Sequence, residues 1–311
     1  MTRLRLCAPA KVNLGLRVVG RRADGYHLLE TTFHALQVHD VLWLEDADAL
    51  SLEVRGDGGG LPMPAPDDNL VLRAARAFAT ATGAQATGRF VLDKHIPAGG
   101  GLGGGSSDAA AALLLLQHRA GAPLDADALN TLALRLGADV PFFLRAGTQT
   151  ARGVGEVLEP TSAPVSARFV LLIPPFGTST AAVFKNYRAD LTIARPSGRI
   201  PPDNPGPIKG LSGSPGQGSW WCNDLEAAAM ELHPELARIR ASAEAIVRRP
   251  VAMSGSGSTL FFALDAATPN AARELEALLP ALARIGDGLR VVSTATADAK
   301  VGSRVPVVVA D

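Results

Sequence analysis

The segment "DKHIPAGGGLGGGSSDAAAALLLL", from Asp93 to Leu116, joins a glycine-rich loop directly to an Ala/Leu run. Six of the seven residues from Gly99 to Gly105 are glycines. Ordering glycine costs more backbone entropy than ordering any other residue. A loop of this kind before a helix is therefore expected to bring backbone N–H groups close to an anion. The plainer interpretation, a flexible turn, is disfavoured by the helix directly behind it.

The loop fits neither of the two common glycine motifs for phosphate binding. A P-loop has a lysine before its Ser or Thr, whereas Ser106 here follows Gly105 directly. A dinucleotide-binding loop belongs to an early βαβ unit, whereas several strand-like segments precede this loop. Clustered N–H groups at a helix N-terminus bind phosphate in either motif. The hydroxyl of Ser106 or Ser107 could cap the helix, contact phosphate or help to hold Mg2+.

Apolar alternation and turn signals predict a strand-rich first half with late helices, which is typical of an α+β domain. Strands are expected at 12–18, 26–36, 40–46, 50–56 and 89–96, with a hairpin turn at Asp24–Gly25. Helices are expected at Leu70–Thr82, Asp108–Arg119 and Asp125–Leu136. Asp67 or Asp68 is the expected cap of the first of these helices.

The second half begins again at an apolar run, residues 167–175, that suits a buried strand. Helices are expected at 180–187, 223–232, 235–246 and 270–282, a strand–loop–strand at 251–264, and a last strand at 289–296. This order is close to a ferredoxin-like split βαβ with an inserted helical pair. We therefore expect two domains, residues 1–165 and 166–311. The segment 197–219 is rich in Pro, Gly and Ser and is expected to be a mobile insertion.

Composition excludes several classes of function. The 311 residues include 30 basic and 30 acidic side chains, so net charge gives no reason to expect nucleic acid or an anionic membrane as partner. The longest apolar run, Ala109–Leu116, is far shorter than the roughly 20 residues of a membrane span. The N-terminus lacks the pattern of a signal peptide. Cys7 and Cys222 are isolated, which indicates reduced thiols in a cytoplasmic protein. A homodimer is compatible with the sequence.

Separated motifs together resemble the GHMP kinases. They are "PAKVNLGL" (9–16), the loop 97–110, which matches P-x-x-x-G-L-G-S-S-A-A with an extra Gly-Gly, and "MSGSGST" (253–259). The resemblance implies an α+β fold of two domains, an N-terminal ribosomal-protein-S5-domain-2-like α/β domain and a C-terminal ferredoxin-like domain. It also implies ATP and Mg2+ as cofactors.

Longer versions of the motifs narrow the expected substrate. "APAKVNLGLRVVGRRADGYHLLET" (8–31), "IPAGGGLGGGSSDAA" (96–110), "GADVPFFL" (137–144) and "NDLE" (223–226) resemble members that phosphorylate a cytidine diphosphate-linked methylerythritol. The expected reaction is transfer from ATP to the 2-hydroxyl of that small molecule in non-mevalonate isoprenoid biosynthesis. The alternatives are a GHMP kinase for another small alcohol and a catalytically silent nucleotide-binding homologue.

Lys11 and Asn13 lie two positions apart on a predicted strand and so share the face opposite its apolar residues. Alone, this pattern is typical of a solvated strand face. The resemblance implies that Lys11 and Asp139 are the catalytic pair, with Asp139 accepting the proton of the substrate alcohol or orienting its hydroxyl. Asp139 could otherwise serve as an N-cap. A nearby ammonium would keep this carboxylate ionised.

The resemblance also assigns the ligand-binding residues. Tyr26 stacks on the cytosine, His27 hydrogen-bonds its edge and Phe184 covers its other face, whereas without the resemblance these are ordinary packing residues. The implied substrate-binding set is Asn13, Tyr26, His27, Thr180 and Phe184. The implied nucleotide-binding set is Asn69, Lys94, Pro97, Ala98, Gly99, Gly100, Gly101, Leu102, Gly103, Gly104, Gly105, Ser106 and Ser107.

The sequence leaves two roles open, that of the late loop and that of the magnesium ligands. The late loop Ser254–Ser258 is either a plain hairpin or a loop that closes over the site from the second domain. The sequence identifies no magnesium ligand. Asp108, in the first turn of the predicted helix, could approach the metal or only favour the helix dipole.

Overall fold

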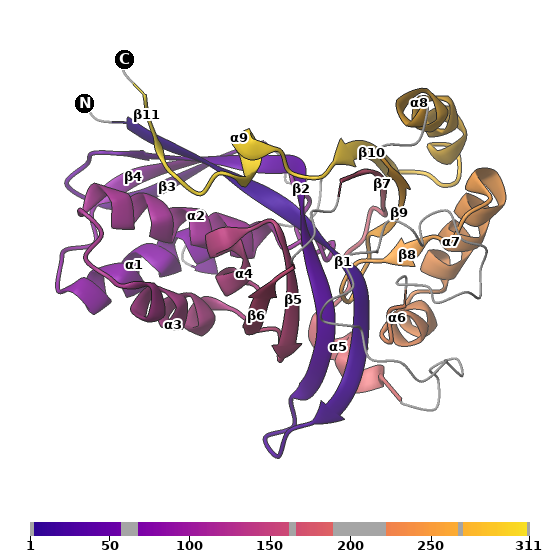
Figure 1. The fold of residues 1–311 in the computed structure, drawn as a ribbon, viewed down its shortest axis with the longest axis horizontal. Coiled ribbons are helices and arrows are strands. Elements are labelled where there is room, and N and C mark those ends of the chain that lie inside the picture. Colours follow the sequence, from indigo (N-terminus) through magenta and orange to yellow (C-terminus); the bar gives the residue numbers. More distant parts are fainter. Residues whose placement is uncertain (1–2, 57–67, 162–165, 189–221, 267–269, 310–311) are drawn as a thin grey trace.

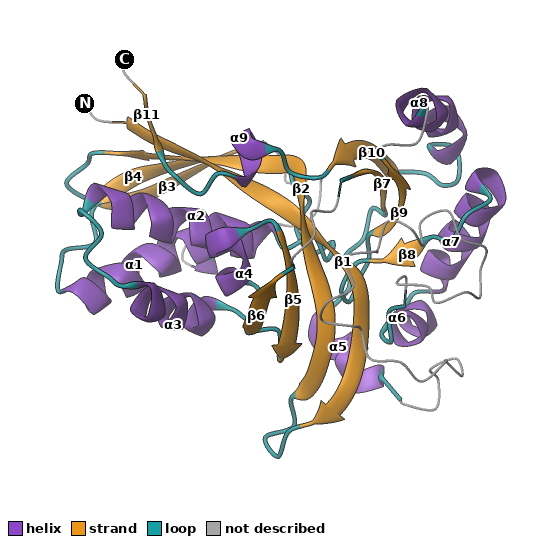
Figure 2. Ribbon diagram, in the orientation of Figure 1, coloured by secondary structure: helices purple, strands orange, loops and turns teal. Residues whose placement is uncertain are grey.

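The computed structural model contains two β-sheets, each covered by helices (Figures 1 and 2). It describes residues 3–56, 68–161, 166–188, 222–266 and 270–309. The predicted insertion 197–219 lies outside the described residues. No helix within these ranges is long and apolar enough to cross a membrane. Two sheets with segregated helices confirm the predicted α+β class.

The first sheet has the order β11-β1-β2-β4-β3, with β5 and β6 continuing from the other end of β2. Its strands are β1 (Arg3–Arg21), β2 (His27–Glu45), β3 (Leu50–Arg55), β4 (Gly88–Asp93), β5 (Thr148–Gly153), β6 (Val157–Pro160) and β11 (Val307–Val309). The helices α1 (Leu70–Thr82), α2 (Gly104–Arg119), α3 (Ala126–Leu136) and α4 (Val140–Arg145) lie on one side of it (Figure 1).

A single long strand, β2, replaces the two strands predicted at 26–36 and 40–46. Strands β1 and β2 form a long antiparallel pair whose register shifts at three places, between Pro9 and Lys11, between Asn13 and Leu16, and between Val18 and Gly20. Such bulges bend and twist a strand without ending it. One end of β2 therefore pairs with β4 and the other with β5.

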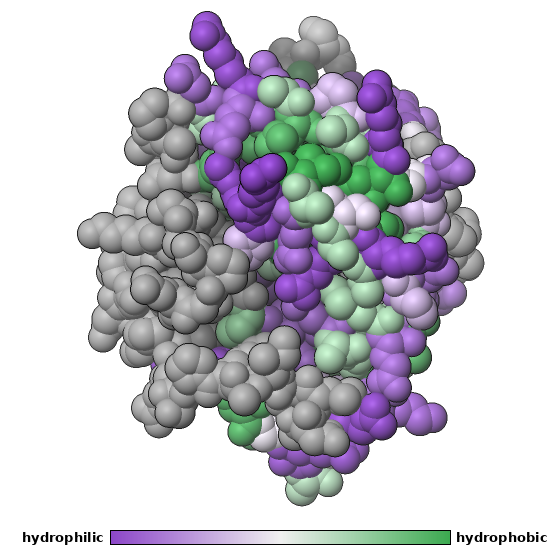
Figure 3. All heavy atoms as spheres, turned by 90° about the vertical axis from the view of Figure 1, so that its right-hand side faces the viewer, coloured by the Kyte–Doolittle hydropathy of each residue, from purple (hydrophilic) through white to green (hydrophobic). Residues whose placement is uncertain are grey.

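The second sheet has the order β10-β7-β9-β8, and all its neighbouring strands are antiparallel. Its strands are β7 (Ala167–Ile173), β8 (Ala252–Met253), β9 (Leu260–Asp265) and β10 (Arg290–Ala295). The helices α5 (Thr180–Asn186), α6 (Glu226–Leu232) and α7 (Pro234–Val247) precede β8, and α8 (Ala271–Leu282) precedes β10. This arrangement confirms the ferredoxin-like prediction. Figure 3 views the molecule from this side, where apolar side chains are interspersed with polar ones.

A shared core between the two sheets sets the direction of the side chains of β1. Ala10, Val12 and Leu14 of β1 pack with Phe169 of β7 and Phe261 of β9. Because neighbouring residues of a strand point to opposite faces, Lys11 and Asn13 project to the other side. Separate apolar clusters lie between the first sheet and helices α1–α4, and between the second sheet and helices α5–α8.

Two helix starts differ from the prediction. Asn69 caps α1, because its side-chain oxygen accepts a hydrogen bond from the amide of Val71 at 2.9 Å. Asp67 or Asp68 was predicted for this role, and Asp67 lies outside the described residues. Helix α2 begins at Gly104 rather than at Asp108, so the glycines themselves enter its first turn.

The end of the chain returns to the first sheet. After β10, α9 (Ala299–Gly302) leads to β11, which pairs antiparallel with β1. Residues 297–309 thus pack with the N-terminal half, although the predicted second domain extended to residue 311. The reason is that the edge of β1 is open to pairing, and a terminal strand satisfies its backbone groups.

Candidate active site

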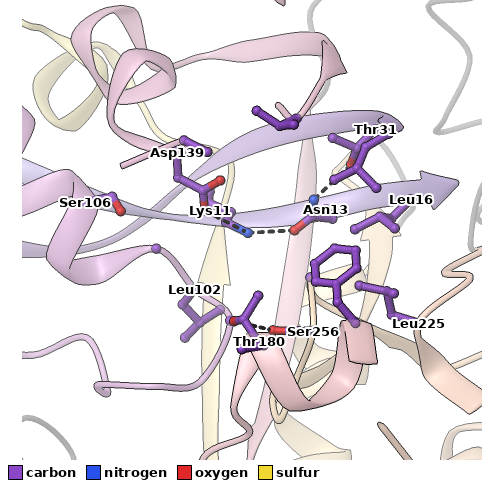
Figure 4. A pocket seen from close by; sticks show the side chains of 18 of the residues that line it. Lys11, Asn13, Leu16, Thr31, Leu102, Ser106, Asp139, Thr180, Leu225 and Ser256 are labelled. Atoms are coloured by element: carbon purple, nitrogen blue, oxygen red, sulfur yellow. Dashed lines mark hydrogen bonds and ion pairs between the residues drawn. The ribbon is translucent and has the colours of Figure 1, made fainter. Parts of the chain in front are cut away.

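Strand β1 and the start of α4 bring Lys11 and Asp139 together at the wall of a cavity. The Nζ of Lys11 lies 3.6 Å from the Oδ2 of Asp139 (Figure 4). Asp139 occupies the N-cap position of α4, but its side chain makes no capping hydrogen bond. The carboxylate instead faces the ammonium and the cavity, so the capping role is not the one that the structure shows.

The Lys11 ammonium is buried and held by fixed partners. It donates to the Oδ1 of Asn13 at 2.7 Å and lies 5.2 Å from the ring of Phe33. Burial lowers the pKa of Lys11, while the charge and the hydrogen bond of Asp139 raise it part of the way back. The charge of this lysine therefore depends on Asp139.

The loop 97–106, which we call the phosphate loop, turns its carbonyl groups inward. Three of its carbonyls accept bonds from other parts of the chain: Gly100 O from Thr259 N at 3.1 Å, Gly101 O from Ser254 Oγ at 2.9 Å, and Leu102 O from Lys11 N at 2.9 Å. Among the described residues, no hydrogen bond has an amide of residues 98–106 as its donor. These amides are free to bind an anion at the N-terminus of α2.

A buried ion cluster supports the phosphate loop from behind. The Nζ of Lys94 donates to Asp40 and, at 2.8 Å, to Asp108. Asp40 also accepts from the amides of His95 and Ile96, which lead into the loop. A Cβ on Gly104 would lie 2.9 Å from the Nζ of Lys94, so the cluster lies directly beneath the first turn of α2.

The cavity has a volume of about 990 Å³ and extends from the phosphate loop to an aromatic end. At that end the ring of His27 stacks on Phe184, with centroids 5.2 Å apart and planes 21° apart. Tyr26 is 65% exposed. The hydroxyl of Thr180, at the start of α5, bonds that of Ser256 in the late loop at 2.9 Å.

Comparison with known proteins agrees with this geometry. The model of the GHMP kinases N terminal domain matches residues 69–147. The 4-diphosphocytidyl-2-C-methyl-D-erythritol kinase of Thiobacillus denitrificans (strain ATCC 25259 / T1) is 42% identical over 282 residues, 88% of this chain and 90% of that protein. That of Xanthomonas axonopodis pv. citri (strain 306) is 40% identical over 268 residues, 86% of this chain and 85% of that protein. The chain belongs to the 4-diphosphocytidyl-2-C-methyl-D-erythritol kinase family of GHMP kinases.

Solved structures extend this family likeness to the fold. A crystal structure of 4-(cytidine 5'-diphospho)-2C-methyl-D-erythritol kinase is 37% identical with a TM-score of 0.71, over 94% of this chain and 99% of that one. A homoserine kinase from Cytophaga hutchinsonii ATCC 33406 shares the fold at 17% identity and a TM-score of 0.66, over 99% of this chain and 97% of that one. The predicted GHMP kinase fold is thereby confirmed.

Most of the site residues expected for this kinase family line one cavity. These are Lys11, Asn13, Tyr26, His27, Pro97, Ala98, Gly99, Gly100, Gly101, Leu102, Gly103, Gly104, Gly105, Ser106, Asp139, Thr180 and Phe184. Three predicted residues lie outside its wall: Asn69 caps α1, Lys94 belongs to the buried cluster, and Ser107 is fully buried.

Sequence reasoning missed several residues that line the cavity of this GHMP kinase. Thr31 and Phe33 come from the inward face of β2, Arg21 from the end of β1, and Lys185 from α5. The alternation of β2 places Thr31 and Phe33 on one face, which was a usable signal. Which face of β2 lines the cavity depends on the register of β1 against β2, and no local pattern specifies that register.

The buried cluster makes the stability of this kinase depend on pH. Burial raises the pKa of Asp108 from 3.8 to about 7, although the charge of Lys94 opposes the rise. Between about pH 4 and about pH 7, the folded protein therefore holds a proton on this carboxyl that the unfolded chain releases. The resulting stability is complete below about pH 4 and is lost as the pH rises through about 7.

We expect Asp108→Asn to lose this part of the pH dependence, because an amide carries no titrating proton. From pH 5 to pH 8 the variant should gain stability relative to the parent protein, as measured by urea unfolding at each pH. The control Asp127→Asn changes an exposed aspartate of α3 and should parallel the parent. If Asp108→Asn also parallels the parent across this range, Asp108 does not hold the extra proton.

Proposed function

We propose that this chain transfers the γ-phosphoryl group of ATP to the 2-hydroxyl of 4-diphosphocytidyl-2-C-methyl-D-erythritol, a step of non-mevalonate isoprenoid biosynthesis. One observation carries the proposal: a single cavity holds free loop amides at one end, the Lys11–Asp139 pair beside them and an aromatic cluster at the other end. The relatives named for this activity, at about 40% identity, support it. The proposal places the enzyme in the cytoplasm, where ATP is available.

The triphosphate of ATP is bound by the phosphate loop. The free amides of residues 98–106 and the dipole of α2 favour phosphate oxygens at this place. Mg2+ would be held mainly by the phosphates. The hydroxyl of Ser106, which lies at the cavity wall, would fit it as an oxygen ligand. When bound, the metal neutralises negative charge on the phosphate groups.

The acceptor alcohol lies between Asp139 and the phosphate loop. Its oxygen forms a bond to the γ-phosphorus, the bond from that phosphorus to the β–γ bridging oxygen breaks, and ADP leaves. Asp139 accepts the proton of the alcohol or orients the hydroxyl until the proton leaves. Lys11 stabilises the charge on the transferred group and keeps Asp139 ionised.

The aromatic end binds the cytosine. Tyr26 is largely exposed and available to a planar ligand, and the rings of His27 and Phe184 stack at the same end of the cavity. We expect Tyr26→Ala to raise the KM of the cytidylyl substrate about 5- to 150-fold, because base stacking on an aromatic ring contributes roughly 1–3 kcal/mol. The KM of ATP should stay unchanged in the same steady-state assay. Tyr26→Phe keeps the ring and should retain a normal KM. An unchanged KM in Tyr26→Ala would contradict the stacking role.

The reaction itself can be tested with a panel of alcohols. The purified protein is incubated with ATP, Mg2+ and, in turn, the cytidylyl substrate, homoserine, mevalonate and galactose, and ADP release is followed together with 31P NMR of the product. The proposal expects turnover with the cytidylyl substrate and a phosphomonoester at its 2-position. Turnover with another alcohol alone would indicate a different GHMP kinase. ATP binding without turnover on any alcohol would indicate a silent homologue.

A further inference from the structure

We propose that Thr31 is a positioning residue of this site, whose hydroxyl sets the orientation of the Asn13 amide so that its carbonyl oxygen faces the Lys11 ammonium. The Nδ2 of Asn13 donates to the Oγ1 of Thr31 at 2.8 Å, and Lys11 donates to the Oδ1 of Asn13 at 2.7 Å. Figure 4 shows Lys11, Asn13 and Thr31 joined in this order. The kinetic part of the proposal rests on the proposed function.

In the series of hydrogen bonds from Lys11 through Asn13 to Thr31, only one choice of donor and acceptor is possible for each bond. The Thr31 hydroxyl also bonds the backbone carbonyl of Gly15, which can only accept, so the single hydroxyl hydrogen lies there. Its oxygen must then accept from Asn13, and the amide must present Nδ2 to Thr31 and Oδ1 to Lys11. An ammonium has donors only, so this is the orientation that Lys11 requires.

The bulge in β1 creates this arrangement. Thr31 of β2 is the register partner of Leu16, and the register shifts between Asn13 and Leu16. Gly15 lies inside that shift, where its carbonyl meets the Thr31 hydroxyl. Asn13 is 4% exposed and Thr31 is 2% exposed, so solvent has little access to replace a lost hydroxyl.

The Lys11 charge has few other partners. Asp139, at the start of α4, is the titratable group whose charge acts on it, and burial opposes it. From β2 it meets the Phe33 ring. From the late loop the ammonium approaches Gly255, and from the phosphate loop Gly103 approaches the aliphatic stem of Lys11; neither glycine carries a charge. An inverted Asn13 amide would replace an acceptor at 2.7 Å by a donor, and the protonated form of Lys11 would lose its hydrogen-bonded neighbour.

The test compares Thr31→Val, which keeps the shape and removes the hydroxyl, with Thr31→Ser, which keeps the hydroxyl. The matched control is Thr32→Val, because Thr32 is also buried but points to the other face of β2. We expect Thr31→Val to lower kcat about tenfold and to move the basic limb of the pH–rate profile to lower pH, because Lys11 loses its proton more easily. The KM of ATP should not change. Thr31→Ser and Thr32→Val should keep the parent profile.

A second measurement does not depend on catalysis. The side-chain NMR signal of Lys11 in lysine-labelled protein, assigned with Lys11→Met, is titrated in the parent and the variants. A lower pKa of Lys11 in Thr31→Val than in Thr31→Ser supports the positioning role even if no alcohol is phosphorylated, which separates it from a failure of the proposed function. Equal Lys11 titrations in the two variants overturn it. Should Thr31→Val not fold, Thr31→Ala takes its place in the same comparison, with thermal unfolding as the check of folding.

Discussion

Replacing Asp139 by asparagine is expected to lower kcat by about 10²- to 10⁴-fold, the usual contribution of a general base. The substitution removes the carboxylate that lies 3.6 Å from the Lys11 ammonium and nearly keeps the volume of the side chain. An amide can neither accept the alcohol's proton nor balance the buried lysine. Because Asp139 makes no capping bond, α4 should form as before.

Two measurements separate this chemical effect from a loss of binding. The dissociation constant of ATP, from calorimetry, should stay within about threefold of the parent, since the phosphate loop is untouched. Asp127→Asn, on the exposed start of α3, removes one negative charge elsewhere and should leave kcat unchanged. A kcat near the parent value in Asp139→Asn would remove this carboxylate from the mechanism.

Gly101→Ala is expected to unfold or misplace the phosphate loop. Gly101 has a φ of +77°, and a Cβ there would lie 2.4 Å from the carbonyl oxygen of Ser254 and 2.8 Å from that of Gly257. Both are backbone atoms of the late loop and cannot move away cheaply. We expect a loss of about 2–5 kcal/mol in the free energy of unfolding and a fall in kcat of about 10²-fold, because reacting groups displaced by 1 Å lose about that much.

The control for Gly101→Ala separates backbone strain from collision. Gly121 has a similar φ of +73°, but nothing lies within 4 Å of the place of its Cβ. Gly121→Ala should therefore lose only about 1–2 kcal/mol, the cost of a left-handed conformation, and keep its kcat. Urea unfolding and steady-state kinetics of both variants measure the difference. Equal losses would mean that the late loop does not press on the phosphate loop.

The residues of the phosphate loop could be identified from sequence because its chemistry is local. Consecutive glycines before an Ala/Leu run predict exposed amides at a helix start, and the structure has the loop's carbonyls bonded inward and its amides free. The start of α2 was nevertheless predicted four residues late. Helix propensity disfavours glycine, yet Gly104 and Gly105 lie in the first turn of α2, where Gly104 packs closely over Lys94 and Ile96.

The roles of the buried polar residues around the site were harder to predict. The family resemblance assigned both Lys94 and Asn69 to the nucleotide. In the structure Lys94 is neutralised by Asp40, which comes from a different strand, and Asn69 caps α1. A polar side chain next to a binding loop serves either the ligand or the scaffold, and only its burial and partners distinguish the two.

From the sequence alone, turn residues and apolar alternation predicted an α+β fold with a glycine loop at a helix start, and the motifs showed the resemblance to the GHMP kinases, because these are properties of short segments. Only the tertiary structure decided that Lys11, Asn13 and Thr31 form one directed hydrogen-bond chain beside Asp139. Those contacts depend on a bulge in β1, on its register against β2 and on the position of α4, which long-range packing sets.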